Sequence, residues 1–296
     1  MSESRGRGSG DCHPDPEHRE GEGAHAGMRG AHARMAPFAA LRVTVVFLLP
    51  ALLLAPTLPL AAQDAPHIAD NSFLIEEAYN QESGVVQHIS TFSRLEGGGA
   101  WGFGFTQEWP FRGIQHQLSY TVPVLHVPVL TPDGSGTGLG DVLLNYRYQL
   151  VGDGETPLHV APRLSVILPT GSEDEGRGTG SVGLQTNLPL SYVLSDALVA
   201  HGNAGLTLEG ESGDVDANLG ASAIWRVHRS VNLMLETVWG SAQDDVVLLN
   251  PGVRWAFDFD SGLQIVPGFA YTFALGGDDA EALFLYLSFE HPFRRE

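Results

Sequence analysis

The strongest constraint on this chain is an alternation of apolar with polar or small side chains, which has a period of two residues and recurs along most of its length. In residues 263–273 one face is apolar or aromatic and the other is mostly small. In residues 142–150 one face is again apolar, whereas the other carries Asn145, Arg147 and Gln149. Because successive side chains of a β-strand point to opposite faces, this period predicts strands with two unlike faces.

Twelve segments show the alternation. This is an even number, and each segment is close to the roughly 9 to 11 residues that a tilted strand needs to cross a bilayer. They are residues 85–92, 101–109, 116–124, 142–150, 159–168, 182–192, 198–208, 215–227, 231–239, 247–257, 263–273 and 282–291. The predicted fold class is therefore all-β, a transmembrane up-and-down antiparallel β-barrel of about 12 strands.

An exported soluble β-sandwich is the alternative, because it also alternates but buries its apolar face, whereas a membrane barrel turns that face to lipid. The connections distinguish the two folds. If both ends of the barrel region face the periplasm, the outer connections are long and acidic, as in 131–140, 170–181 and 274–281. Inner connections such as 194–197 and 228–230 are short. Long outer loops that alternate with short inner turns favour the barrel.

Aromatic residues are placed as a membrane barrel requires. Trp101, Trp109, Tyr192, Trp225 and Trp239 lie at or near the ends of the predicted strands. Outer-membrane barrels carry aromatic girdles at these positions, although ordinary strand aromatics are an alternative explanation.

The end of the chain indicates how such a barrel is assembled. The last strand carries Leu283, Leu285, Leu287 and Phe289 on one face, and Phe293 follows close to the terminus. This pattern resembles the assembly signal of outer-membrane barrels, although the last three residues depart from it. The expected partners are therefore outer-membrane lipid and the barrel-assembly machinery.

An apolar run at residues 43–62 is preceded by Arg34 and Arg42 and closes in small residues, which is typical of a signal peptide. A transmembrane helix is the alternative, but three prolines interrupt the run. The expected location is the outer membrane of a Gram-negative-type bacterium. The expected organisation is a disordered extension or start-site artefact (1–34), a signal peptide (35–62), a periplasmic N-terminal segment (63–84) and an outer-membrane barrel (85–293).

Charge and cysteine content exclude several functions. The chain has 16 basic and 35 acidic residues, a net charge of -19, so it has few cations with which to bind a phosphate backbone, and no nucleic-acid partner is expected. Its single cysteine, Cys12, excludes an intramolecular disulfide framework, a four-cysteine zinc site and an iron–sulfur cluster. We expect no cofactor, no metal site and no catalytic residues.

Three glycine-rich segments resemble a known family. They are 138–150 (GLGDVLLNYRYQL), 163–171 (RLSVILPTG) and 178–185 (GTGSVGLQ). They are similar to the outer-membrane β-barrel family named after the meta-pathway of phenol degradation, which is described as transporter-like. The resemblance implies a porin-like channel or transporter for small solutes, aromatic or hydrophobic compounds among them. A non-conducting structural barrel and an outer-membrane lipid-modifying enzyme are the other functions to test.

The polar side chains of the alternating strands are the candidate lumen lining. In a narrow lumen they either pair into a plug or leave a hydrated, selective path, and lumen packing alone explains them equally well. The candidates are Asn145, Arg147, Gln149, Arg163, Gln185, Asn187, His201, Asn203, Asn218, Arg226, Asn232, Glu236, Asn250, Arg254 and Gln264.

His88 and Ser90 carry the enzyme hypothesis. They lie two residues apart on one strand face and resemble the His-x-Ser pair of outer-membrane phospholipases. A polar lumen wall explains both residues without catalysis, and we expect the same of His116 and His201.

Residues 71–80 (NSFLIEEAYN) are the one segment after the signal peptide with a plausible helical pattern. Leu74, Ile75 and Ala78 have helical spacing, and Ser72 is a candidate N-cap. About ten residues form a stable helix only when docked. We therefore hypothesise that the segment lies against or within the periplasmic mouth of the barrel and restricts the lumen. An unstructured lead into the first strand is the alternative.

Overall fold

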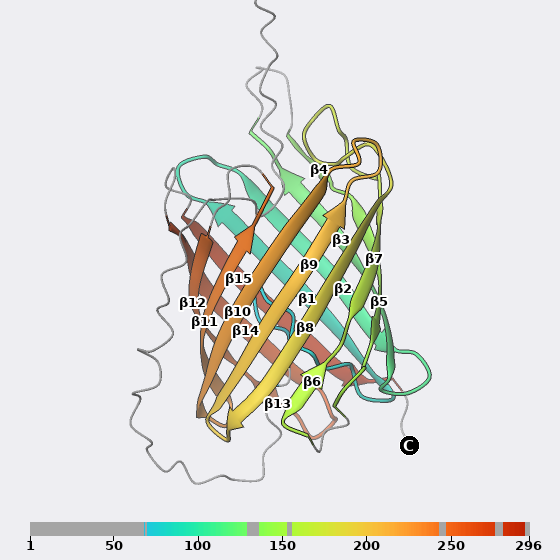
Figure 1. The fold of residues 1–296 in the computed structure, drawn as a ribbon. Coiled ribbons are helices and arrows are strands. Elements are labelled where there is room, and N and C mark those ends of the chain that lie inside the picture. Colours follow the sequence, from blue (N-terminus) through green and yellow to red (C-terminus); the bar gives the residue numbers. More distant parts are fainter. Residues whose placement is uncertain are drawn as a thin grey trace, which may run out of the picture. The chain divides into compact units, whose positions relative to one another are not determined.

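Twelve antiparallel strands close into a barrel in the computed structural model (Figure 1). The structure describes residues 68, 70–128, 136–152, 156–242, 247–275 and 281–293, all within the unit Ala33–Glu296. The predicted extension and signal peptide lie outside these residues. The barrel strands are β1 (Val85–Leu95), β2 (Trp101–Pro110), β3 (His116–His126), β5 (Val142–Tyr148), β7 (Arg163–Leu168), β8 (Gly183–Ser195), β9 (Leu198–Leu208), β10 (Val215–His228), β11 (Val231–Gly240), β12 (Val247–Trp255), β14 (Gln264–Leu275) and β15 (Ala282–Pro292).

Each barrel strand pairs with its neighbours along the chain, and β1 and β15 complete the ring. Their register runs without a shift from Val85 opposite Pro292 to Leu95 opposite Ala282. A closed ladder leaves no unpaired sheet edge, which is the condition for a β-structure in lipid. The predicted up-and-down barrel is confirmed. Among the residues that the structure describes, no helix has the length and hydrophobicity of a membrane span.

Three of the predicted strands are shorter than expected, and one of them, predicted at 247–257, ends as β12 at Trp255. The strand predicted at 142–150 ends at Tyr148, and the one predicted at 159–168 is divided into β6 (Leu158–Val160) and β7. Pro162 lies at the division and has no N–H to donate to a ladder. The other short pieces, β4 (Thr137–Leu139) and β13 (Phe257–Asp258), pair with β3 and β14.

Alternate side chains face outward and inward as the sequence pattern predicts. On β5, Leu144 and Tyr146 are exposed on the outside, whereas Asn145 and Arg147 are buried on the inside. The predicted girdle residues also point outward, and both Tyr192 and Trp225 are exposed there. The outer surface is therefore apolar around a lumen lined with polar groups, which is the arrangement of a membrane barrel.

The two ends of the barrel differ. At one end, here called the terminal end, β1 begins, β15 finishes, and the N–H of Phe293 donates to the carbonyl of Gly84. The short turns β8–β9 and β10–β11 lie at this end. The opposite end, here called the loop end, carries longer connections such as 169–182.

Residues 68 and 70–84 run inside the barrel before β1 begins, as the blue-green trace between the strands shows (Figure 1). Ile68, Ile75, Ala78 and Glu77 of this stretch are almost completely buried. We call residues 68 and 70–84 the lumen segment.

Outward-facing leucines provide a test of the membrane barrel. Leu188 lies near the middle of β8 and Leu194 near its end, both exposed on the outer face. We expect Leu188→Arg to destabilise the barrel in lipid vesicles by about 2 to 4 kcal/mol, and the control Leu194→Arg by about 0 to 1 kcal/mol. Unfolding by guanidinium, followed by the mobility of unboiled samples on gels, measures both. Equal effects would argue for a soluble sandwich.

Candidate functional site

The lumen segment forms neither helix nor strand, so the predicted helix at 71–80 is wrong. Its backbone groups bond to side chains of the barrel wall and not to one another. Glu236 accepts from the N–H groups of Leu74 (2.9 Å) and Ile75 (3.1 Å). Ser72 does not cap a helix, because its hydroxyl donates to Glu77 Oε1 at 3.0 Å. Buried backbone groups need partners, and here the wall supplies them.

Two wall amides bind the segment's backbone at two points each. Asn203 accepts from the N–H of Glu76 (2.9 Å) and donates to the carbonyl of the same residue (2.8 Å). Gln149 accepts from the N–H of Asn80 (3.0 Å) and donates to the carbonyl of Ala78 (2.8 Å). These side chains supply the backbone hydrogen bonds that a neighbouring strand would supply in a sheet.

Arg254 of β12 binds the beginning of the segment. Its guanidinium donates to the carbonyls of Asp70 (2.8 Å), Asn71 (2.9 Å) and Ile68 (3.3 Å). It also lies 3.0 Å from a carboxylate oxygen of Glu77. Both side chains are buried, so each charge is compensated by the other and by the carbonyl dipoles.

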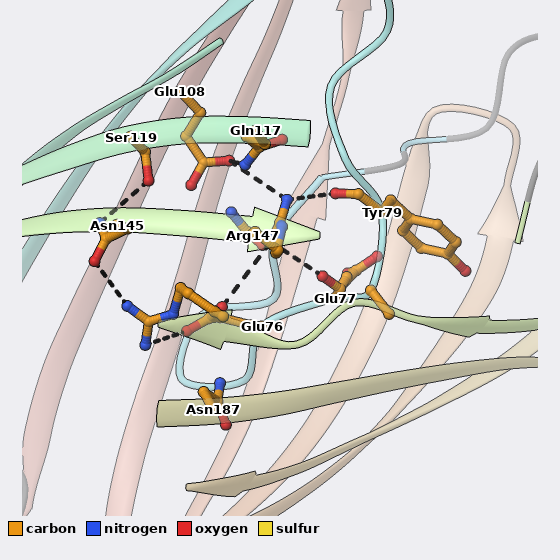
Figure 2. A network of polar contacts seen from close by, with 12 residues as sticks. Glu76, Glu77, Tyr79, Glu108, Gln117, Ser119, Asn145, Arg147 and Asn187 are labelled. Carbon is orange, nitrogen blue, oxygen red and sulfur yellow. Dashed lines mark hydrogen bonds and ion pairs between the residues drawn. The ribbon is translucent and has the colours of Figure 1, made fainter. Parts of the chain in front are cut away.

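Arg147 of β5 binds the other half of the segment (Figure 2). It donates to the carbonyls of Tyr79 (2.5 Å) and Glu77 (3.3 Å) and to the side-chain oxygen of Asn80 (2.9 Å). Glu108 of β2 faces it at 3.7 Å. Glu108 in turn accepts from Gln117 at 2.7 Å.

Arg163 of β7 pairs with Glu76 at 2.7 Å. The wall itself orients this arginine, which donates to Asn145 (3.0 Å), Ser165 (2.7 Å) and Gln185 (2.8 Å). Three arginines from three strands therefore hold one segment.

Phe73 anchors the segment in an apolar socket. Its ring centroid lies 5.4 Å from those of Phe284 and Tyr286. A Cβ at Gly252 or Gly268 would come within 2.6 or 2.5 Å of the Phe73 ring. Glycine inside a strand permits this close approach, so the wall is shaped to accept an aromatic side chain.

Asp70 is buried beside this socket. Its Oδ1 accepts hydrogen bonds from the hydroxyl of Tyr286 (2.6 Å), from the N–H of Asn71 (2.8 Å) and from Gln87. Burial raises the pKa of Asp70 to about 6, and the positive charge of Arg254 opposes part of that rise.

A cavity in the lumen borders the segment. Its volume is about 160 Å³, and it lies between residues 71–76 and the walls of β1, β2, β3, β5 and β7. Thr91, Thr106 and Thr121 line its polar side, and Arg163 and Glu76 also border it.

The predicted lumen residues all lie on the inner face. Seven of them contact the segment: Arg147, Gln149, Arg163, His201, Asn203, Glu236 and Arg254. Four others hold these in place, namely Asn145, Gln185, Asn187 and Asn250. The remaining four are Asn218, Arg226, Asn232 and Gln264, of which Gln264 bonds to Asp258 of β13.

The placement of His88, Ser90 and His116 in the lumen wall is wrong. Gln87 and Ile89 face inward on β1, so His88 and Ser90 face outward. His88 Nε2 lies 3.3 Å from His291 Nε2 on the outer surface. The lumen-wall explanation of His88 and Ser90 is therefore wrong, and the enzyme hypothesis stays a prediction.

Ser191 and His201 are in contact within the lumen, with Oγ 2.7 Å from Nδ1. The N–H of Ala78 donates to the same Ser191 oxygen at 2.8 Å, and Ser191 is fully buried. The segment covers the pair, whose role in this state is to hold the segment.

Sequence reasoning missed several residues that touch the segment. Gln87 and Gln117 bond to Asp70 and Gln81, and Ser191 bonds to Ala78. Their position on the alternating inner face was available as an indication. The socket glycines were also detectable, because glycine within a strand marks close approach of another group.

The three glycine-rich segments meet at the loop end. The carboxylate of Asp141, at the start of β5, accepts from the N–H groups of Gly171 (2.9 Å) and Thr179 (2.8 Å). Thr170 donates to the carbonyl of Gly140 at 2.7 Å. The three glycine-rich segments therefore attach the β7–β8 loop to the rim of the barrel.

The fold and the polar lumen define a closed, up-and-down antiparallel β-barrel with a porin-like architecture. The chain belongs to the family described as "Putative MetA-pathway of phenol degradation", whose model matches residues 64–276. No curated protein matches the chain.

Three solved structures serve for comparison with this chain. The crystal structure of the COG4313 outer membrane channel from Pseudomonas putida F1 is similar with a TM-score of 0.52 and 13% identity, over 72% of this chain and 97% of that one. The KdgM porin (TM-score 0.47, 8% identity) covers 70% of this chain and 99% of its own. The NanC porin structure is similar with a TM-score of 0.48 and 9% identity, over 70% of this chain and 98% of that one.

Filling the Phe73 socket should release the segment. We expect Gly268→Val to weaken docking by about 1 to 3 kcal/mol, because the added atoms overlap the ring. The readout is maleimide labelling of a Ser72→Cys variant, whose thiol would be buried when the segment is docked. Labelling should accelerate with Gly268→Val and stay unchanged with the control Gly202→Ala, where a Cβ meets nothing closer than 3.8 Å. Equal labelling in all three proteins would contradict the socket.

Proposed function

We propose that the protein is an outer-membrane channel for small solutes and that its own lumen segment closes it. The observation that carries the proposal is the way in which the segment is bound. Side chains of the wall hold it through hydrogen bonds, ion pairs and one aromatic anchor, and it shares no ladder with any strand. The segment can therefore leave while every strand pairing of the barrel remains intact.

The barrel's surfaces support an outer-membrane location. The outer face is apolar with aromatic residues near the strand ends, as lipid requires. We place the terminal end in the periplasm and the loop end outside, because short turns gather at the former and long connections at the latter. The segment then occupies the lumen from the periplasmic side.

A permanently closed structural barrel is the second candidate. The dense bonding of Arg147 and Arg254 to the segment favours it, since removing buried charge partners is costly. Against it, the cavity beside Arg163 shows that the segment does not fill the lumen.

Deleting residues 71–80 should open the channel. We expect single-channel conductance in planar bilayers to rise severalfold over the native protein, because the residues that occupy the lumen are gone. The control combines Glu82→Ala and Ser83→Ala, two exposed positions of the same segment, and should conduct like the native protein. A deletion variant that migrates as a folded barrel on unboiled gels and still fails to conduct would favour the closed structural barrel.

Channel opening should depend on pH through Asp70. An aspartate in a released segment has a pKa of about 3.9, whereas docking raises it to about 6. Docking therefore takes up a proton, is strengthened in mild acid and is weakened as the pH rises through about 6. We expect the open probability to be about tenfold lower at pH 5 than at pH 8. Asp70→Asn should remove most of this difference; an undiminished difference would show that Asp70 is not the group that titrates.

A further inference from the structure

In the ion pairs that hold the lumen segment, the segment supplies the negative charges and the wall supplies the positive ones. All charged residues in 70–84 are acids: Asp70, Glu76, Glu77 and Glu82. Their partners on the wall are arginines, including Arg163 and Arg254. When the segment leaves, the arginines of the wall lose the segment carboxylates that paired with them. Because an unpaired buried charge is costly, another anion in the lumen would then be favoured.

Of these ion pairs, the one between Arg163 and Glu76 can be reached from the cavity. The side chains of Arg163 and Glu76 are 14% and 26% exposed, whereas those of Arg254 and Glu77 are 1% and 3% exposed. Arg163 and Glu76 both border the cavity beside the segment. A solute that enters the cavity therefore meets this ion pair first.

Arg163 is prepared to bind an anion without Glu76. Asn145, Ser165 and Gln185 fix its guanidinium from the wall. Its Nε is buried and has no hydrogen-bond partner in the part of the chain that the structure describes. Replacing Glu76 by another carboxylate leaves all three wall contacts in place.

The cavity limits the size and chemistry of the solute. Its volume of about 160 Å³ is close to the roughly 150 Å³ that is sufficient for benzene in a protein interior. Phe73, Ile89 and Tyr286 contribute apolar surface to the lining, and Arg163 contributes a cationic group. One small molecule with an apolar body and an anionic end matches this lining.

Charge balance separates an anionic solute from a neutral one. Two arginines, Arg147 and Arg163, face two carboxylates, Glu76 and Glu108, in this part of the lumen. A solute carboxylate that takes the place of Glu76 preserves the balance. A neutral solute leaves Arg163 without a counter-charge.

We propose that the solute is a small organic carboxylate, which binds Arg163 in place of Glu76 and so breaks the ion pair between the lumen segment and β7. This inference rests on the proposed channel function and names its solute class. Glu76 acts as an internal ligand that holds the site until a free carboxylate competes with it.

Calorimetric titration with benzoate, and with benzamide as the neutral analogue of the same shape, tests the proposal on the purified full-length mature protein in detergent. Glu76→Ala should bind benzoate at least tenfold more tightly than the native protein, because the internal competitor is gone. Adding Arg163→Gln to that variant should abolish the binding. Benzamide should bind to none of these proteins. The control Asp216→Asn, which removes an acid from β10, three strands along the sheet from the β7 strand of Arg163, should match the native protein.

Equal benzoate affinities of the native and Glu76→Ala proteins, binding that survives Arg163→Gln, or equal binding of benzamide would each overturn the proposal. If Glu76→Ala does not fold, as judged on unboiled gels, Glu76→Gln gives the same comparison. Conductance of the 71–80 deletion variant separates the two proposals. A conducting deletion variant without the benzoate pattern refutes only the solute class, whereas the benzoate pattern with a silent deletion variant refutes only the channel.

Discussion

A buried guanidinium must be surrounded by anions or carbonyl oxygens, and the inner architecture of this barrel depends on that requirement. Arg147 and Arg254 are almost completely buried on the lumen face. Between them they bond to five backbone carbonyls of the lumen segment. The wall alone does not provide these acceptors. Wall and segment are therefore complementary parts of one interior, although the strand ladder is complete without the segment.

The outer surface must be compatible with lipid, whereas the inner surface must bond to the lumen segment. This difference explains which features the sequence could predict. Lipid demands an apolar face on every strand, so alternation shows through in all twelve segments, and the strand order follows from an up-and-down connection. Inward polar residues on β5, β8, β9 and β11 were identifiable for the same reason. The candidate residues on these strands, from Asn145 to Glu236, face the lumen.

Polarity was a poor guide where the lumen is apolar. Ile89 of β1 belongs to the cluster around Phe73, so the inner face of β1 mixes polar and apolar groups and His88 was assigned to the wrong side. The segment itself was misjudged for a related reason. Leu74, Ile75 and Ala78 have helical spacing, but the partners that fix their backbone are wall side chains such as Glu236, 161 residues away from Ile75. Local pattern contains no information about such distant contacts.

The distances along the chain between the segment and its partners have a consequence for the order of folding. The segment precedes every strand, yet Arg254 lies 184 residues beyond Asp70 and Tyr286 lies 216 residues beyond it. The Phe73 socket combines glycines of β12 and β14 with aromatic rings of β15, so it exists only once the last strands are in place. Since contacts of such high sequence separation form late, the part of the barrel that is synthesised first is the last to acquire its native position.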